Sequence, residues 1–194
     1  MTGTITQPEN EFALVPEIAV SVGISPLDAP AVTRKWVNVT TGGHISGVAW
    51  NTGPSELVLI HRDEADARSL DRVALLIHRP TVVLDQAGAG RSSGPRASSA
   101  QRAARGLAEA VASFAPQARV AAGIGDGARA ALALANRREQ ISTVVLVDAP
   151  PADTEPRGGL TVVEVRTDTD RAETAAASEI ATALVNALNE GESS

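Results

Sequence analysis

The segment Gly123-Ile124-Gly125-Asp126-Gly127 combines three glycines with one carboxylate at the end of a short apolar stretch. Glycines at this spacing allow a sharp bend between a strand and a following helix, and such a bend can present main-chain N–H groups to a ligand. Asp126 is the one ionisable side chain of the segment, and the positive end of the helix dipole would stabilise its carboxylate. The segment therefore predicts a site that offers backbone donors and a carboxylate but no hydroxyl nucleophile.

His61 is the second residue whose type and position could support chemistry. It follows the apolar residues 57–60 and stands beside Arg62, Asp63 and Glu64. An imidazole near carboxylates can bind a metal or move protons, but a metal site needs about three convergent ligands and adjacent residues seldom converge. A charged loop at the end of a strand is the favoured interpretation, and neither a metal nor another cofactor is expected.

Both groups need a scaffold that brings separate loops to one edge, and the pattern of residues 34–190 predicts one. Short apolar stretches alternate there with longer amphipathic ones, which is typical of an α/β fold with a mostly parallel sheet and helices on both faces. The expected strands are 57–60, 81–84, 118–122, 143–147 and 160–165, and the expected helices are about 65–77, 98–114, 127–138 and 172–188. Such sheets place ligands beyond the carboxyl ends of their strands, where His61 and the glycine segment fall.

The regions around this alternating pattern are simpler. Residues 35–39 and 45–50 flank Thr41-Gly42-Gly43, which predicts an antiparallel hairpin that opens the sheet. Residues 1–33 show no sustained period and several prolines, so they are expected to form a partly ordered N-terminal extension. Residues 34–190 are then a single domain, and 191–194 are a tail that is expected to fray.

Composition excludes several classes of function. The net charge of -6 gives no basic surface for nucleic acid or for an anionic membrane. The absence of cysteine excludes disulfides and thiol chemistry, and the absence of an apolar run of about 20 residues or of a leader-like start makes a cytoplasmic location the expectation. One lysine against sixteen arginines suggests a GC-rich bacterial source.

Two segments resemble the first part of the α/β-hydrolase family, a resemblance that spans about residues 34–168 in all. Residues 57–61 (LVLIH) are similar to the strand before the family's oxyanion loop, with Arg62 where a glycine is usual. Residues 83–93 (VLDQAGAGRSS) look like the family's Asp-x-Pro-Gly-x-Gly-x-Ser loop, with Ala87 in place of the proline. The order of these segments implies an α/β-hydrolase-like fold.

Two further segments resemble the catalytic part of that family. Residues 123–127 fall where the family carries its Gly-x-Ser-x-Gly nucleophile elbow, and Gly125 occupies the serine position. Residues 143–150 (TVVLVDAP) resemble the next strand, after which the family commonly inserts a cap domain. Only a short loop follows here, so the resemblance implies a protein without a lid over its site.

The resemblance also implies that the family's catalytic triad is incomplete. Its histidine follows a final strand, after the acidic member, whereas no histidine follows His78 in this sequence. Asp168 and Asp170 match the acidic position, but they have no imidazole to orient. No residue is therefore expected to be catalytic, and the leading hypothesis is a pseudo-hydrolase.

Such a protein would act by binding an unidentified small molecule or protein partner. The expected site is a vestigial cleft formed by His61, Arg62, Gly125 and Asp126, with Asp168 at the acidic position. Without a lid, the exposed top of the sheet invites a partner or a second copy, so a homo-oligomer is a further expectation.

Two alternatives stay open. Main-chain N–H groups after residue 60 and at Asp126 could polarise the carbonyl of a small ester, giving residual hydrolysis. Alternatively, Gly123-x-Gly125-x-x-Ala128 with Asp148 matches the fingerprint of a dinucleotide-binding Rossmann protein. Asp126 as a nucleophile is disfavoured, because the elbow would shift by one residue and place a β-branched side chain at the bend.

Overall fold

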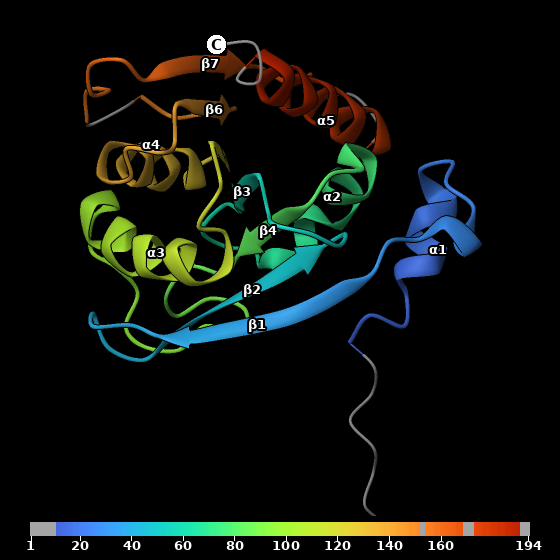
Figure 1. Ribbon diagram of the computed structural model, residues 1–194, viewed down its shortest axis with the longest axis horizontal. Coiled ribbons are helices and arrows are strands. Elements are labelled where there is room, and N and C mark those ends of the chain that lie inside the picture. Colours follow the sequence, from blue (N-terminus) through green and yellow to red (C-terminus); the bar gives the residue numbers. More distant parts are fainter. Residues whose placement is uncertain (1–10, 152–153, 169–172, 191–194) are drawn as a thin grey trace, which may run out of the picture.

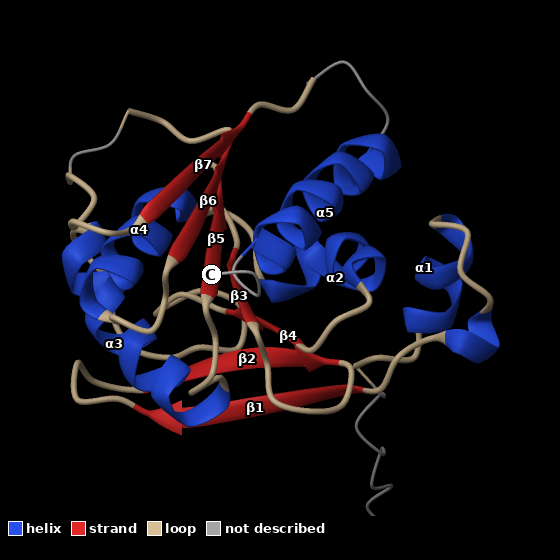
Figure 2. Cartoon of the chain, turned by 45° about the horizontal axis from the view of Figure 1, so that its top comes forward, coloured by secondary structure: helices blue, strands red, loops and turns tan. Residues whose placement is uncertain are grey.

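A computed structural model describes residues 11–151, 154–168 and 173–190, whose strands form one sheet with helices on both faces (Figures 1 and 2). The sheet order is β1-β2-β4-β3-β5-β6-β7. The strands are β1 (Val32–Asn38), β2 (His44–Trp50), β3 (Leu57–Ile60), β4 (Thr81–Leu84), β5 (Val120–Ile124), β6 (Thr143–Val147) and β7 (Thr161–Val165). β1 and β2 run antiparallel to their neighbours, and the other pairs are parallel. The predicted fold class is confirmed.

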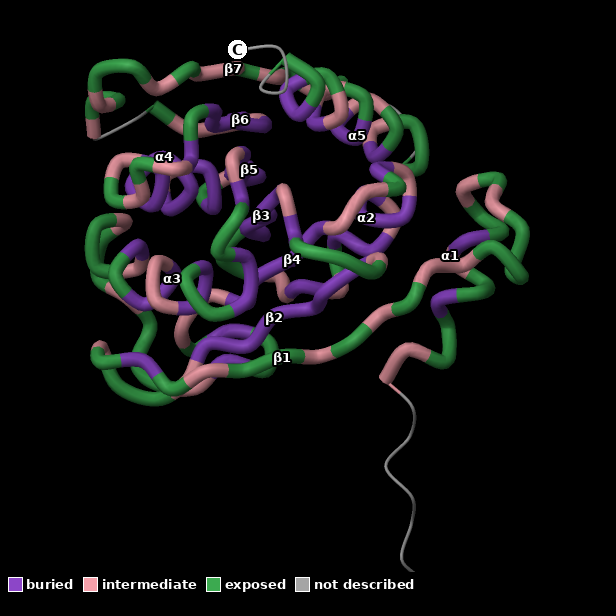
Figure 3. The backbone as a smooth tube through the Cα atoms, in the orientation of Figure 1, coloured by how far each residue is buried: buried purple, intermediate pink, exposed green. Residues whose placement is uncertain are grey.

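The helices cover the sheet in two layers with separate cores. Residues of α1 (Val15–Ser21), α2 (Asp71–Ile77) and α5 (Glu173–Glu190) share one core, and those of α3 (Ala100–Phe114) and α4 (Gly127–Arg137) share the other. Short 3₁₀ turns, η1 (Pro26–Asp28) and η2 (Ala67–Leu70), complete the described elements. Both layers bury the central strands, which Figure 3 shows as a buried band.

The sequence explains these elements locally. α3 begins where the Ser99 hydroxyl accepts a hydrogen bond from the Arg102 N–H, and its buried residues Leu107, Val111 and Phe114 recur at helical spacing. The central strands β3 and β4 are apolar except for Thr81 and are buried on both faces, as a parallel sheet requires. None of the helices in the described ranges has the length and apolarity needed to cross a membrane.

The predicted elements agree with the structure except for small shifts at their ends. β1 starts three residues before the expected strand 35–39, and the expected helix 65–77 is divided into the turn η2 and the helix α2, which begins at Asp71. β5 starts and ends two residues later than the expected strand 118–122. Gly123 and Ile124 belong to the strand because they pair with Leu146 and Val147 of β6. The bend is consequently confined to Gly125 and Asp126. The residues 191–194 and the expected helix start at 172 lie outside the described residues.

The N-terminal region contributes more order than its sequence pattern suggested. Val15 and Ala19 of α1 are buried and belong to the same core as the side chains of α2. Glu11 joins the segment to the domain, because its carboxylate pairs with Arg34 of β1 and its carbonyl oxygen accepts a hydrogen bond from Arg68. The part of the predicted extension before residue 11 lies outside the described residues.

This attachment predicts a pH dependence. The hydrogen bond from Arg34 lowers the pKa of Glu11 below its ordinary value of 4.5. A lowered folded pKa adds stability above the unfolded pKa, and this stability is lost as the pH falls through the folded pKa. We expect the free energy of unfolding of the parent chain to exceed that of Glu11→Gln by up to about 1 kcal/mol at pH 7. Urea titrations between pH 7 and 3 should show this difference shrinking below pH 4.5, and a constant difference would contradict the assignment.

Candidate functional site

The bend between β5 and α4, here called the elbow (residues 123–127), is enforced by close packing around two of its glycines. A Cβ atom on Gly123 would collide with the carbonyl oxygen of Gly127. A Cβ on Gly127 would collide with the carbonyl oxygen of His61 and lie 2.8 Å from that of Ile60. Both positions therefore require glycine, since backbone atoms cannot move aside cheaply.

Gly125, at the tip of the elbow, is in a different situation. Its φ of 56° lies in the left-handed region, and its N–H donates to the carbonyl oxygen of Val147 at 2.8 Å. The nearest atom to an added Cβ would be the Cβ of Arg62, at an ordinary 3.4 Å. The elbow thus has the backbone shape of a turn that exposes the side chain at its tip. Of its three glycine positions, only the tip, Gly125, has room for a side chain.

Asp126 follows the tip and is exposed at the N-cap of α4. Its carboxylate makes no capping hydrogen bond to the helix. The expected position at the helix start, where the dipole favours a negative charge, is confirmed. Because the carboxylate forms no hydrogen bond or ion pair with another side chain in the described ranges, it is available to a ligand.

His61 is buried below the elbow and does not reach the molecular surface. Its side chain is fully buried, its Nδ1 donates to the carbonyl oxygen of Arg62 at 2.7 Å, and its Nε2 accepts from the N–H of Gln86 at 3.4 Å. An Asp85 carboxylate oxygen lies 3.6 Å from Nε2, beyond hydrogen-bond distance. With both ring nitrogens facing protein groups, the imidazole holds two loops together and has no face toward a substrate.

Asp85 organises the loop that follows β4. Its buried carboxylate accepts hydrogen bonds from Arg34 at 2.9 Å and from the main-chain N–H groups of Ala67 at 2.7 Å and Arg91 at 3.0 Å. Gly90 packs so closely that an added Cβ would overlap this carboxylate. The family-like loop of residues 83–93 is therefore held by a charge-assisted network.

The same loop is anchored to the hairpin between β1 and β2. The Ser92 hydroxyl accepts from the N–H of Ser46 at 2.8 Å and donates to the carbonyl oxygen of Asp85 at 2.8 Å. The Ser93 hydroxyl lies 2.8 Å from Nδ1 of His44. His44 is half-exposed as a result, whereas His78, at the end of α2, is exposed.

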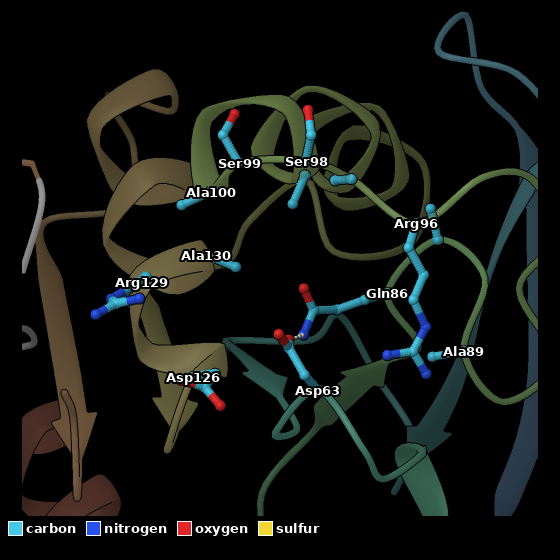
Figure 4. Close-up of a pocket in the computed structure, with 13 residues that line it drawn as sticks. Asp63, Gln86, Ala89, Arg96, Ser98, Ser99, Ala100, Asp126, Arg129 and Ala130 are labelled. Carbon is cyan, nitrogen blue, oxygen red and sulfur yellow. Dashed lines mark hydrogen bonds between the residues drawn. The ribbon is translucent and has the colours of Figure 1, made fainter.

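Two pockets flank the elbow. The first, here called the polar pocket, has a volume of about 290 Å³ and lies between the loop after β4, the start of α3 and the start of α4 (Figure 4). Two carboxylates, Asp63 and Asp126, and two guanidinium groups, Arg96 and Arg129, line it. Arg129 donates to the carbonyl oxygen of Pro151, and the Asp63 carboxylate accepts from Gln86 at 3.1 Å. Arg96 makes no ion pair or hydrogen bond within the described ranges.

The second pocket, here called the apolar pocket, lies on the other side of the elbow between α2, α5 and the ends of β5 to β7. Its volume is about 330 Å³. Its wall is mostly aliphatic, and Arg62, Asp148 and the ion pair Arg72–Glu173 add charge.

The structure separates the residues predicted to share one cleft. Arg62 lines the apolar pocket, Asp126 lines the polar pocket, and Gly125 lies between them in contact range of Arg62. His61 is buried below, and Asp168 is exposed after β7 and lines neither pocket. Asp170 lies outside the described residues.

Sequence reasoning missed some residues that line the pockets. Asp63 was noted only as a member of the charged loop beside His61, and Arg96 was not singled out, yet both line the polar pocket from different loops (Figure 4). Asp148 was considered for a dinucleotide site, but its carboxylate instead accepts hydrogen bonds from the N–H and hydroxyl of Thr167. Position after a strand end was the usable signal for Asp63 and Asp148, which follow β3 and β6. Arg96 lies far along the loop between β4 and α3, and no such signal marked it.

The sheet order also bears on the dinucleotide alternative. A Rossmann domain carries its glycine fingerprint after the first strand of an order 3-2-1-4-5-6. The glycine turn here follows the fifth strand of the order β1-β2-β4-β3-β5-β6-β7. The structure thus does not favour dinucleotide binding.

Two main-chain donors remain available at the elbow. Among the described residues, neither the N–H of Arg62 nor that of Asp126 has a hydrogen-bond acceptor. These are the N–H after β3 and the N–H after the elbow tip, the two positions from which α/β-hydrolases stabilise an oxyanion. The described part of the chain contains no group of three side chains suited to hold a metal ion.

Comparison with solved structures shows which proteins share this architecture. An esterase from M. tuberculosis has a TM-score of 0.65 and 26% identity over 75% of this chain and 49% of its own. An epoxide hydrolase from Acinetobacter nosocomialis has a TM-score of 0.56 and 20% identity over 77% of this chain and 48% of its own. A haloalkane dehalogenase from Bradyrhizobium elkani has a TM-score of 0.54 and 15% identity over 61% of this chain and 42% of its own.

These neighbours, together with the sheet order and the elbow, define the class: this is an α/β-hydrolase-fold protein. The chain spans about half the length of the solved structures it matches. Neither a family model nor a curated protein matches its sequence.

Proposed function

We propose that this α/β-hydrolase-fold protein binds a small molecule at the elbow and does not hydrolyse it. The two pockets supply charged groups and an aliphatic wall on either side of a turn that is shaped to present a reacting group. A glycine stands at the position from which a nucleophile would attack, so the bound molecule meets backbone donors but no hydroxyl.

The observation that carries the proposal is the combination of a preserved elbow with an engaged histidine. Gly123 and Gly127 keep the bend, while Gly125 offers no attacking atom. The one histidine near the bend, His61, is fully buried with both nitrogens facing protein groups, so it does not serve as a general base. The bend is thereby kept, while its tip carries no nucleophilic hydroxyl and His61 is not free to accept a proton from one.

Hydrolysis of p-nitrophenyl acetate tests this proposal. We expect the purified chain to release p-nitrophenol no faster than buffer, even at high protein concentration. Gly125→Ser should remain without turnover as well, because a serine at the tip would find no imidazole to accept its proton. Asp126→Asn and Asp28→Asn each remove one negative charge, the first beside the elbow and the second on the exposed turn η1. Both variants should release p-nitrophenol at the same rate as the parent chain.

Turnover by the parent chain that falls in Asp126→Asn but not in Asp28→Asn would overturn the proposal. It would instead support residual hydrolysis in which the Asp126 carboxylate takes part, while the free N–H groups of Arg62 and Asp126 polarise the ester carbonyl. Self-association through the uncovered top of the sheet and a cytoplasmic location are further parts of the proposed role.

A further inference from the structure

The apolar pocket contains one positive and one negative group without an ionic partner. Arg62 forms no ion pair or hydrogen bond through its guanidinium among the described residues. Asp148 forms no ion pair there either, and each of its carboxylate oxygens accepts a single hydrogen bond from Thr167. The other two charges of the pocket, Arg72 and Glu173, neutralise each other at 2.8 Å.

The two unpaired groups line the cavity from different elements, Arg62 as an exposed residue and Asp148 as a half-buried one. Arg62 follows β3, and its Cβ lies close to the elbow tip, whereas Asp148 follows β6. Asp148 is held in a left-handed conformation, with φ of 47°, and its N–H donates to the carbonyl oxygen of Val165 at 2.9 Å. A carboxylate oxygen has room for a second hydrogen bond, so Asp148 keeps acceptor capacity that faces the pocket.

Between these charges the pocket is aliphatic. Leu70 and Val73 come from η2 and α2, Ile124 from the end of β5, and Ala177 and Ile180 from α5. These side chains belong to the core below the pocket and give it a rigid apolar floor. A volume of about 330 Å³ suits a small molecule, not a polymer.

From this arrangement we infer that the apolar pocket binds an aliphatic α-amino acid as a zwitterion. The ligand carboxylate pairs with Arg62, its ammonium group donates to Asp148, and its side chain lies against Ile124, Val73 and Ile180. A guanidinium recognises a carboxylate through paired hydrogen bonds, and burial of the hydrocarbon adds to affinity. A simple monocarboxylate would pair with Arg62 but would be repelled by the negative charge of Asp148. A simple amine would pair with Asp148 but would be repelled by the positive charge of Arg62.

This inference deepens the proposed binding role but does not depend on the absence of hydrolysis. The ester assay tests catalysis at the elbow, whereas calorimetry with amino acids tests occupancy of the apolar pocket. A chain that hydrolyses esters could still bind leucine, and a chain without turnover could fail to bind it. The two failures are therefore distinguishable.

Isothermal titration calorimetry with L-leucine tests the inference, using glycine, 4-methylpentanoate and isopentylamine as partial ligands. We expect L-leucine to bind about 100-fold more tightly than glycine, because glycine lacks the buried hydrocarbon. Each partial ligand that lacks one charge should bind at least about tenfold more weakly than leucine.

Variants assign the two charges. Arg62→Gln and Asp148→Asn should each weaken leucine binding by about tenfold or more. Asparagine tolerates the left-handed conformation at position 148, so this variant should keep its fold. Arg105→Gln on the exposed side of α3 and Asp28→Asn make the same charge changes away from the pocket and should bind like the parent chain.

Three results would overturn the inference. The first is no heat of binding with L-leucine at millimolar concentration. The second is equal affinity for leucine and 4-methylpentanoate, which would remove the role of Asp148. The third is unchanged binding in both Arg62→Gln and Asp148→Asn when circular dichroism shows them folded, which would place the ligand elsewhere.

Discussion

Gly127→Ala is expected to lower the free energy of unfolding by at least about 3 kcal/mol, or to prevent folding. The added methyl group would overlap the carbonyl oxygen of His61 and lie 2.8 Å from that of Ile60, and Ile60 is the last residue of the central strand β3. Relief would require α4 to move away from the sheet. Urea unfolding followed by circular dichroism measures this loss.

The matched control for this prediction is Gly125→Ala, two residues earlier. Its Cβ would make only an ordinary contact with Arg62, so the cost is that of a left-handed alanine, about 1–2 kcal/mol. If both variants lost the same stability, the elbow would not be shaped by close packing, and the argument that its tip alone has room for a side chain would be wrong.

Asp85→Ala should have the second large effect, a loss of about 3–5 kcal/mol in the free energy of unfolding. The substitution removes the buried carboxylate that pairs with Arg34, which keeps only Ser46 and Glu11, and it leaves the N–H groups of Ala67 and Arg91 without acceptors. The loss comes from these unsatisfied groups and not from the small volume removed.

Asp63→Ala is the control for the removal of an acidic side chain at a neighbouring loop. Asp63 is exposed and accepts one hydrogen bond, from Gln86, so its removal should change stability by no more than about 0.5 kcal/mol. Equal losses in the two variants, measured by urea unfolding at pH 7, would show that the network around Asp85 does not stabilise the loop after β4.

Much of the fold follows from local pattern. The strands β3, β4 and β6 occupy the predicted residues, because runs of Val, Leu and Ile bounded by polar loops have no other stable place than a buried parallel sheet. The glycines of the elbow likewise predicted a bend before α4. The pattern placed the end of β5 two residues too early, because pairing with β6 extends this strand through Gly123 and Ile124.

The site was harder to predict, because its contacts join distant parts of the chain. Arg34 and Asp85 are 51 residues apart and meet only because β2 lies between β1 and β4. His61 looked like a cleft residue on account of its place after a strand, but the following loop folds over it and uses both ring nitrogens. Position along the chain thus predicted the edge of the sheet but not which side chains face solvent there.

The outer strands of the sheet have a consequence for solubility at high concentration. β1 and β7 each have a single neighbour among the described strands, so each presents an open edge of main-chain donors and acceptors. Trp36 on β1 is 70% exposed, which by itself would make that edge a template for aggregation. Lys35 beside it and Glu164 on β7 place exposed charges in the middle of each strand. A strand from another molecule could pair with either edge only by burying the charge on it. Lys35, the one lysine of the chain, therefore disfavours edge-to-edge polymerisation through β1.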